Sequence, residues 1–345
     1  MLTLRRAREP KPPVGDEEGV PDLARPWHRR IPLADIADRY GILVAWGVVI
    51  VIFSILDPTT FFTAGNFQTV FGSQAVLVIL ALGLLLPLTV GEFDLSVAGA
   101  LSVSVVFVGF LNVEHGWPII PSIAVALASG LVIGAVNTFF VMVVGLPSMV
   151  VTLGSGTLWM GVAYGIEPSN VAGISNGLVN FTNTNWILGL PLAFFYCLLL
   201  TIVIWYVYSF TPLGRYLHFV GANRQVARLS GIPVTAIRAS SLMLSAFISS
   251  IAGVVLVGSL ASSSPSVASA YLLPAFAAVF LGGTAITPGR FNPWGTFIAV
   301  YFLITGITGL ELFGLTGWVE DAFYGASLVF AVALSRLAAR RRRVD

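Results

Sequence analysis

Charged residues are scarce in this chain, and the few that exist avoid most of its length. Only 10% of the residues are charged and 57% are hydrophobic, with a mean hydropathy of +0.90. Soluble domains carry about 25% charged residues. The 345 residues are therefore not expected to form water-soluble domains. Apolar runs of about 18 or more residues instead predict helices that lie in the lipid bilayer.

Lysine is almost absent, and its absence excludes one route to ATP hydrolysis. Lys11 is the only lysine, so the phosphate-binding pattern G-x-x-x-x-G-K-[ST] does not occur. The zinc-protease pattern H-E-x-x-H is missing as well. We therefore expect no catalytic residue, no cofactor and no ATPase motif in this chain, and a chain that crosses the membrane many times without them would be a transport subunit.

Cysteine and histidine are also rare. Cys197 is the only cysteine, so no disulfide can form within the chain. The three histidines, His28, His115 and His218, lie in separate polar regions without the spacing of metal ligands. We expect no metal site.

Ten apolar runs are long enough to cross a bilayer as helices. Glycine and proline interrupt several of them, which membrane helices tolerate. The runs lie near residues 41–57, 67–90, 96–112, 118–144, 147–166, 186–208, 239–259, 271–287, 293–310 and 319–337.

The basic residues test this count. Eight precede the first run, four lie between the sixth and seventh, Arg290 lies between the eighth and ninth, and five follow the last. Ten spans with a cytoplasmic N-terminus place all of them on the cytoplasmic side, as the positive-inside rule requires. We therefore predict an all-α integral membrane protein with about ten transmembrane helices and both termini in the cytoplasm.

The spans divide the chain into three parts. Residues 1–40 are polar and predict a disordered cytoplasmic tail. Residues 41–337 form the predicted transmembrane domain, with a long cytoplasmic loop near 209–238. Residues 338–345 form a basic cytoplasmic tail that would lie near anionic lipid.

The long loop reads TPLGRYLHFVGANRQVARLSGIPVTAIRAS from Thr211 to Ser240. Asn223 suits a helix N-cap and Gly231 a left-handed helix stop, so the loop predicts short helices. Arg224 and Arg228 would share one face and pair with acids on a partner or with lipid phosphate. The loop is therefore either a docking element for a soluble partner or an amphipathic linker on the headgroups.

A second polar interruption, VGEFDLSV, lies between the second and third runs. Asp94 or Ser96 is expected at the N-cap of the third span, where an acid complements the helix dipole. Alternatively, the segment dips into the protein and places Asp94 near a gate or pathway. Glu92 is the less certain of the two acids.

Four segments resemble the motifs of sugar-type ABC transporter permeases, the family that contains the ribose permease. The loop matches T-x-x-G-R-Y and then G-x-N-x-x-A-A-x-x-S-G-I, with Val226 in place of the first alanine. VGEFDLSVAG is similar to G-G-x-D-L-S-V-G, LPSMVVTLGSGTLWMG to P-x-x-V-T-L-G-x-x-x-x-x-x-G, and AAVFLGGTAITPGRFNPWGT to V-x-L-G-G-x-x-x-x-G-x-G-x-x-x-G-T. The resemblance covers residues from about 40 to 337. Its departures include Glu92, Ala98, Met160, Pro288 and Asn292.

The resemblance implies a set of partners. Two permease chains, identical or different, would form a pathway in the cytoplasmic (inner) membrane of a prokaryote. Two ATP-binding subunits would dock on the loop and supply the energy. An extracytoplasmic solute-binding protein would deliver a monosaccharide or similar polyol. Membrane lipid would surround the assembly, and no nucleic acid is expected.

The residues and the resemblance together give candidates for two roles. The expected ATPase-coupling residues are Gly214, Arg215, Gly221, Asn223, Arg224, Ala227, Arg228, Ser230, Gly231 and Ile232. The candidates for a pathway or gate are Gly91, Glu92, Asp94, Ser96, Thr152, Gly154, Gly282, Gly283, Thr284 and Arg290.

The residues alone leave several alternatives open. Thr152 and Gly154 serve either tight helix packing or a sugar path. The segment from Gly282 to Arg290 is either a broken helix near the substrate or a tight turn whose arginine reaches the headgroups. The cargo is a sugar or another small solute, such as a nucleoside or a signalling furanose. An ion-coupled secondary transporter is a further alternative, although few buried charges are available for it.

Overall fold

The structure, a computed structural model, describes residues 33–315 and 317–341. Helices dominate this part of the chain, and the two strands found in it are two residues long. The elements are α1 Leu33–Leu56, α2 Ala64–Ser73, α3 Ala75–Thr89, α4 Val97–Gly109, η1 Phe110–Glu114, α5 Ile119–Thr138, η2 Phe139–Val143, α6 Ser148–Ile166, β1 Val171–Ala172, α7 Asn176–Asn183, η3 Ile187–Gly189, α8 Leu192–Phe210, α9 Pro212–Ala222, α10 Arg224–Leu229, α11 Val234–Leu260, β2 Ser262–Ser263, η4 Pro265–Tyr271, α12 Leu272–Gly282, α13 Pro293–Leu312 and α14 Trp318–Arg341.

The predicted all-α membrane protein is confirmed. Nine helical stretches in the described residues are long and apolar enough to cross a membrane, and each overlaps one of the first nine predicted runs. The tenth predicted run is occupied by α14. Two spans have edges that differ from the predicted ones. The sixth span begins at Leu192, after Pro191, and the eighth runs from Pro265 to Gly282, because the chain turns at the segment Gly283–Asn292.

The predicted N-terminal tail falls largely on residues 1–32, which lie outside the described residues. Within the described part, α1 already begins at Leu33, earlier than the predicted start of the first span.

The centre of the bundle is formed by α3, α4 and α11. Every residue of α3 is buried, and α11 packs against α3, α4 and α5. Small residues permit the close approach of these helices. A Cβ at Gly134 of α5 would lie 2.8 Å from the Cα atom of Met243 on α11, so the two backbones are nearly in contact.

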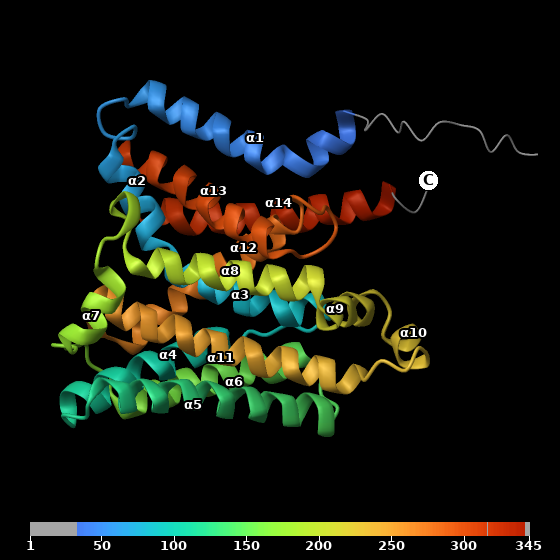
Figure 1. The fold of residues 1–345 in the computed structure, drawn as a ribbon, viewed down its shortest axis with the longest axis horizontal. Coiled ribbons are helices and arrows are strands. Elements are labelled where there is room, and N and C mark those ends of the chain that lie inside the picture. The colour runs from blue at the N-terminus through green and yellow to red at the C-terminus, as the bar shows by residue number, and fades with distance from the viewer. Residues whose placement is uncertain (1–32, 316, 342–345) are drawn as a thin grey trace, which may run out of the picture.

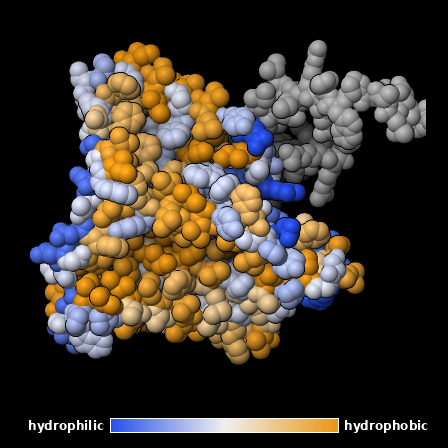
Figure 2. Space-filling model, viewed as in Figure 1, coloured by the Kyte–Doolittle hydropathy of each residue, from blue (hydrophilic) through white to orange (hydrophobic). Residues whose placement is uncertain are grey.

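The bundle has two distinct ends (Figure 1). α9 and α10 project at one end, where α14 also finishes, and α2 and α7 lie at the opposite end. Hydrophobic residues cover most of the visible face between these ends (Figure 2), as expected for a surface in contact with lipid. The long loop is therefore a compact helical projection beyond the apolar part of the bundle.

Candidate coupling and gating site

The projecting segment consists of two short helices whose starts are fixed by side chains. Thr211 precedes Pro212 and its hydroxyl accepts a hydrogen bond from the backbone of Gly214, so α9 begins there. Asn223 ends α9 and begins α10. Its Oδ1 accepts hydrogen bonds from the backbone N–H groups of Gln225, at 2.9 Å, and Val226, at 3.1 Å. The predicted N-cap at Asn223 is confirmed.

The end of α10 is also as predicted. Gly231 has a φ of +77°. Its N–H donates to the carbonyl of Arg228 at 3.1 Å, and the N–H of Ile232 donates to that of Ala227 at 3.1 Å. These two bonds form a Schellman motif, which needs a left-handed residue at the Gly231 position. Beyond this stop, Pro233 leads into α11, so the geometry at Gly231 fixes the direction of α10.

This geometry yields a first prediction. Proline at position 231 would require a negative φ and would remove the N–H that bonds to Arg228. We expect Gly231→Pro to insert normally into the membrane but to lower solute uptake by at least about tenfold. Misplacing α10 would destroy its contact with the docking partner, and the loss of a contact worth more than about 1.4 kcal/mol is at least a tenfold effect. Asparagine tolerates a left-handed conformation, so Gly231→Asn is the matched control and should retain most of the uptake. Normal uptake by Gly231→Pro would contradict a role for α10 in coupling.

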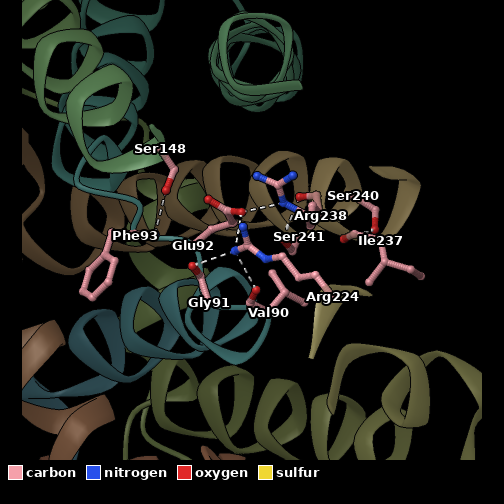
Figure 3. Close-up of polar contacts among 10 residues, drawn as sticks. All are labelled: Val90, Gly91, Glu92, Phe93, Ser148, Arg224, Ile237, Arg238, Ser240 and Ser241. Carbon is pink, nitrogen blue, oxygen red and sulfur yellow. Dashed lines mark hydrogen bonds and ion pairs between the residues drawn. The ribbon is translucent and has the colours of Figure 1, made fainter. Parts of the chain in front are cut away.

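The turn between α3 and α4 meets this segment through a buried carboxylate (Figure 3). Glu92 is 3% exposed. Its Oε1 lies 2.7 Å from Nη2 of Arg224, the first residue of α10, and 2.5 Å from Nε of Arg238, near the start of α11. Nη2 of Arg224 also donates to the backbone carbonyls of Val90, at 3.1 Å, and Gly91, at 2.9 Å. One acid thus joins α10, α11 and the turn.

Two glycines bring the backbones together at this junction. Gly91 has a φ of +75°, which lets the chain reverse direction directly after α3. Gly221, at the end of α9, lies against the carbonyl group of Thr89, and a Cβ at this position would collide with that oxygen. The turn and the α9–α10 segment are therefore packed backbone to backbone as well as paired through charges.

The opposite side of the turn is held by α6. The hydroxyl of Ser148 accepts a hydrogen bond from the N–H of Phe93 at 3.2 Å. The hydroxyl of Thr152 accepts from the N–H of Leu95, at 3.0 Å, and lies 3.0 Å from the carbonyl of Phe93. Thr152 is completely buried, and its hydroxyl is hydrogen-bonded to the backbone of the turn. Gly154 instead lies on a face of α6 where a Cβ would meet nothing within 4 Å.

The expected side-chain cap at the start of α4 was wrong. Ser96 occupies the N-cap position, but it has helical φ and ψ angles of −77° and −8° and its side chain makes no capping bond. A capping residue is usually extended. Here the hydroxyl and the N–H of Ser96 instead donate to Oδ1 of Asp94, at 2.5 Å and 3.0 Å. Asp94 is completely buried within the protein.

The motif AAVFLGGTAITPGRFNPWGT forms a compact turn between α12 and α13. Gly282 packs against the backbone of Gly295 and Thr296, with no room for a Cβ. Asn292 caps α13 by accepting from the N–H of Gly295 at 2.6 Å, and its amide donates to the carbonyl of Gly282 at 3.2 Å. Asn292, which departs from the family pattern, therefore has a structural role.

The remaining members of this motif have distinct surroundings. The ring of Phe291 packs beside Gly283, and the Thr284 hydroxyl donates to the carbonyl of Leu281 at 2.7 Å. Arg290 is exposed. Burial lowers the pKa of His218 on α9, and the positive charge of Arg290 lowers it further. The α12–α13 turn lies at the same end of the bundle as α9 (Figure 1).

A cavity of about 670 Å³ opens on one side of the α3–α4 turn. Phe93 and Leu95 line it from the turn, Met149 from α6, Phe280 from α12 and Leu328 from α14. The lining is largely apolar. Three of the four motifs noted in the sequence therefore contribute to the same cavity.

The structure thus joins two groups of residues that the sequence kept apart. Gly91 and Glu92 were candidates for a gate and Arg224 for coupling, yet Arg224 contacts both of them. Gly221, another coupling candidate, packs against Thr89 at the end of α3. Arg238 was missed, although an arginine near the start of a predicted span was a usable signal. Arg215 and Ser230 are exposed, as is every residue of α10, Arg228 included, except the buried Ala227. Gly214 is buried as well.

Comparison with known proteins gives a consistent picture. Residues 66–332 match the family described as branched-chain amino acid transport system / permease component. The ribose import permease protein of Escherichia coli (strain K12) is 31% identical over 297 residues, covering 84% of this chain and 91% of that protein. No solved structure matches.

Two further relatives carry other cargo names. The D-allose transport system permease protein of Escherichia coli (strain K12) is 27% identical over 301 residues, covering 87% of this chain and 92% of that protein. The autoinducer 2 import system permease protein of Photorhabdus luminescens is 28% identical over 261 residues, covering 74% of this chain and 78% of that protein.

Proposed function

This chain belongs to the sugar-type family of ABC transporter permeases, and we propose that it imports a monosaccharide or similar polyol with energy from a separate ATPase. It is a multi-pass protein of the inner membrane. In this proposal residues 41–337 form the permease domain, and the tails 1–40 and 338–345 lie in the cytoplasm.

One observation carries the proposal. A capped helix, α10, projects beyond the apolar bundle and is tied by Arg224 to Glu92 in the α3–α4 turn. The same turn lines the cavity through Phe93 and Leu95. A partner that pushes on α10 would therefore act directly on a wall of the cavity.

The surface of α10 fits a soluble partner. Leu229 is 84% exposed and Val226 is 49% exposed, and Arg228 lies beside them on the projecting helix. An apolar tip with an adjacent positive charge suits a groove that carries an acid. We assign this groove to the ATP-binding subunit, with two such subunits serving two permease chains.

The translocation pathway, in this proposal, passes along the cavity. The neighbouring face of α6 is strongly apolar and unoccupied in the single chain, with Met149 54% exposed, Val150 65% exposed and Leu153 53% exposed. A second permease chain, identical or different, would close the cavity from this side. A solute-binding protein would deliver the cargo at the end of the bundle that holds α7.

The test is uptake by proteoliposomes that contain this chain with its ATP-binding subunit. Labelled ribose, allose and autoinducer 2 form the first panel, because these are the cargoes in the names of the relatives. We expect uptake of at least one sugar-like solute that requires both ATP and the ATPase. An ATPase lacking the lysine of its phosphate-binding loop is the matched control and should support none.

Two outcomes would contradict the proposal. Uptake that continues without any ATPase and follows an ion gradient would make the chain a secondary transporter. ATP-driven uptake restricted to solutes without hydroxyl groups would retain the ABC permease but exclude the sugar or polyol cargo.

A further inference from the structure

Asp94 and its neighbours form a buried cluster of oxygen atoms that the coupling mechanism does not use. Asp94, Ser96, Asn137 and Ser245 are all completely buried. They come from the α3–α4 turn, the start of α4, the end of α5 and the middle of α11. Three of their oxygen atoms have no hydrogen-bond partner: Oδ2 of Asp94, Oδ1 of Asn137 and Oγ of Ser245.

The hydrogen bonds fix which atoms lack a donor. Ser96 has one hydroxyl proton, and it is donated to Oδ1 of Asp94 over 2.5 Å. Asn137 must therefore direct its amide N–H toward Ser96, over 2.7 Å, which leaves its own carbonyl oxygen as an acceptor. The cluster thus has two acceptors that lack a donor, Asp94 Oδ2 and Asn137 Oδ1, and one free donor, the Ser245 hydroxyl, which can serve only one of them.

Neither ion pair in the described part of the chain includes Asp94. α9 and α10 pack on the turn and carry Arg215, Tyr216, His218, Arg224 and Arg228. The other elements around it are α3, α4, α5, α6 and α11, and Arg238 of α11 is the one charged residue in their sequences. Arg238 and Arg224 both pair with Glu92, which is the other acid of the turn. Tyr164, the other titratable group on these helices, lies near the far end of α6.

We propose that Asp94 is a proton-binding site and that its carboxyl group is held as the neutral acid, with the proton on Oδ2. A proton is the smallest ligand that meets both requirements of the cluster, because it removes the unbalanced charge and turns an acceptor into the missing donor. Burial independently raises the pKa of Asp94, and the Ser96 hydroxyl, the Ser245 hydroxyl and the Ser96 N–H lower it by less.

The proposal sets the sign of a pH effect. The unfolded chain releases this proton near the ordinary aspartate pKa of about 4, whereas the folded protein keeps it to higher pH. Between these two values the folded state binds one more proton, so its stability falls as the pH rises. The unfolding equilibrium constant should increase by up to about tenfold per pH unit over this window.

The experiment compares equilibrium unfolding of the full chain and of Asp94→Asn in mixed micelles from pH 4 to 8. Asparagine imitates the shape of the neutral acid but cannot titrate. We expect the two proteins to be similar at pH 4 and the variant to be the more stable at pH 8. Glu114→Gln, at an exposed position beyond α4, is the matched control and should follow the wild type.

Two results would overturn the proposal. A ratio of the two unfolding constants that does not change with pH would mean that Asp94 is ionised in the fold, with a buried water as the donor. A ratio that changes with sodium concentration at fixed pH would assign the site to a sodium ion.

A second measurement needs no variant. Infrared spectra of the wild type with ¹³C-labelled aspartate should show one protonated, isotope-shifted carboxyl group at pH 7. Its absence would also overturn the assignment.

Discussion

Glu92→Gln should lower ATP-driven uptake by at least about tenfold while the chain still inserts and still binds its ATPase, because it removes the charge that joins α10 and α11 to the turn. Glutamine keeps the size of the side chain. It leaves Arg224 and Arg238, which both contact Oε1 of Glu92, without their shared counter-charge. Two neighbouring positive charges would then repel each other and loosen the junction.

The energy of this change follows from the exposure of the three groups. Removing one partner of a fully buried ion pair costs about 3–5 kcal/mol. Arg224 is 42% exposed and Arg238 is 20% exposed, so water screens part of this cost. We expect a loss of about 1–3 kcal/mol in unfolding free energy, measured by equilibrium denaturation in mixed micelles.

Two controls separate the junction from a general loss of charge. Arg228→Gln removes a charge from the exposed face of the same short helix and should change uptake much less. In a double-mutant cycle, Glu92→Gln combined with Arg238→Gln should cost less than the sum of the single changes, because the groups interact directly. Strict additivity, or equal damage from Arg228→Gln, would contradict the role given to Glu92.

Gly221→Ala is expected to have the second large effect. It should destabilise the protein, although helix propensity alone favours alanine over glycine. Alanine in a helix usually stabilises by about 0.5–1 kcal/mol relative to glycine. At Gly221, however, the new methyl group would collide with the carbonyl oxygen of Thr89, a backbone atom that cannot rotate away. Overpacking of this kind costs about 1–3 kcal/mol, so α9 should be displaced from the turn.

The measurement for Gly221→Ala is uptake together with ATPase activity in the same proteoliposomes. We expect uptake to fall by at least about tenfold. Overpacking would displace the coupling segment from the turn, and a cost above about 1.4 kcal/mol corresponds to at least a tenfold effect. Gly47→Ala is the matched control, since a Cβ at Gly47 in α1 would meet nothing within 4 Å. If both variants transport normally, α9 does not press on the turn in the working protein.

The fold was predictable because the bilayer restricts which secondary structures can cross it. Apolar runs of sufficient length have to be helices, and the distribution of arginine fixes their number to about ten. The ends of the short helices were predictable too, since Asn223 and Gly231 act through local backbone chemistry. These features depend on residues close together in the sequence.

The junction could not be predicted, because it depends on contacts between residues far apart in the sequence. Glu92 and Arg238 are separated by 146 positions, and the pattern of either segment alone says nothing about the other. Glu92 was judged the less certain acid because it departs from a motif, yet it makes both ion pairs of the junction. The cap at Ser96 was wrong for a related reason, since Asp94 takes its hydroxyl proton.

The most direct test of the account is whether α10 and the α3–α4 turn move together when the ATPase binds ATP. Spin labels at Leu229 and Phe93 report on this junction. Labels at Phe93 and at Leu273, which lines the cavity from α12, report on the cavity wall. The side chains of Leu229, Phe93 and Leu273 are 84%, 39% and 41% exposed. Replacing the buried Cys197 with alanine leaves only the introduced cysteines for labelling. We predict that ATP changes the Phe93–Leu273 distance and leaves the Leu229–Phe93 distance unchanged. A Leu229–Phe93 distance that changes while Phe93–Leu273 stays constant would contradict the account.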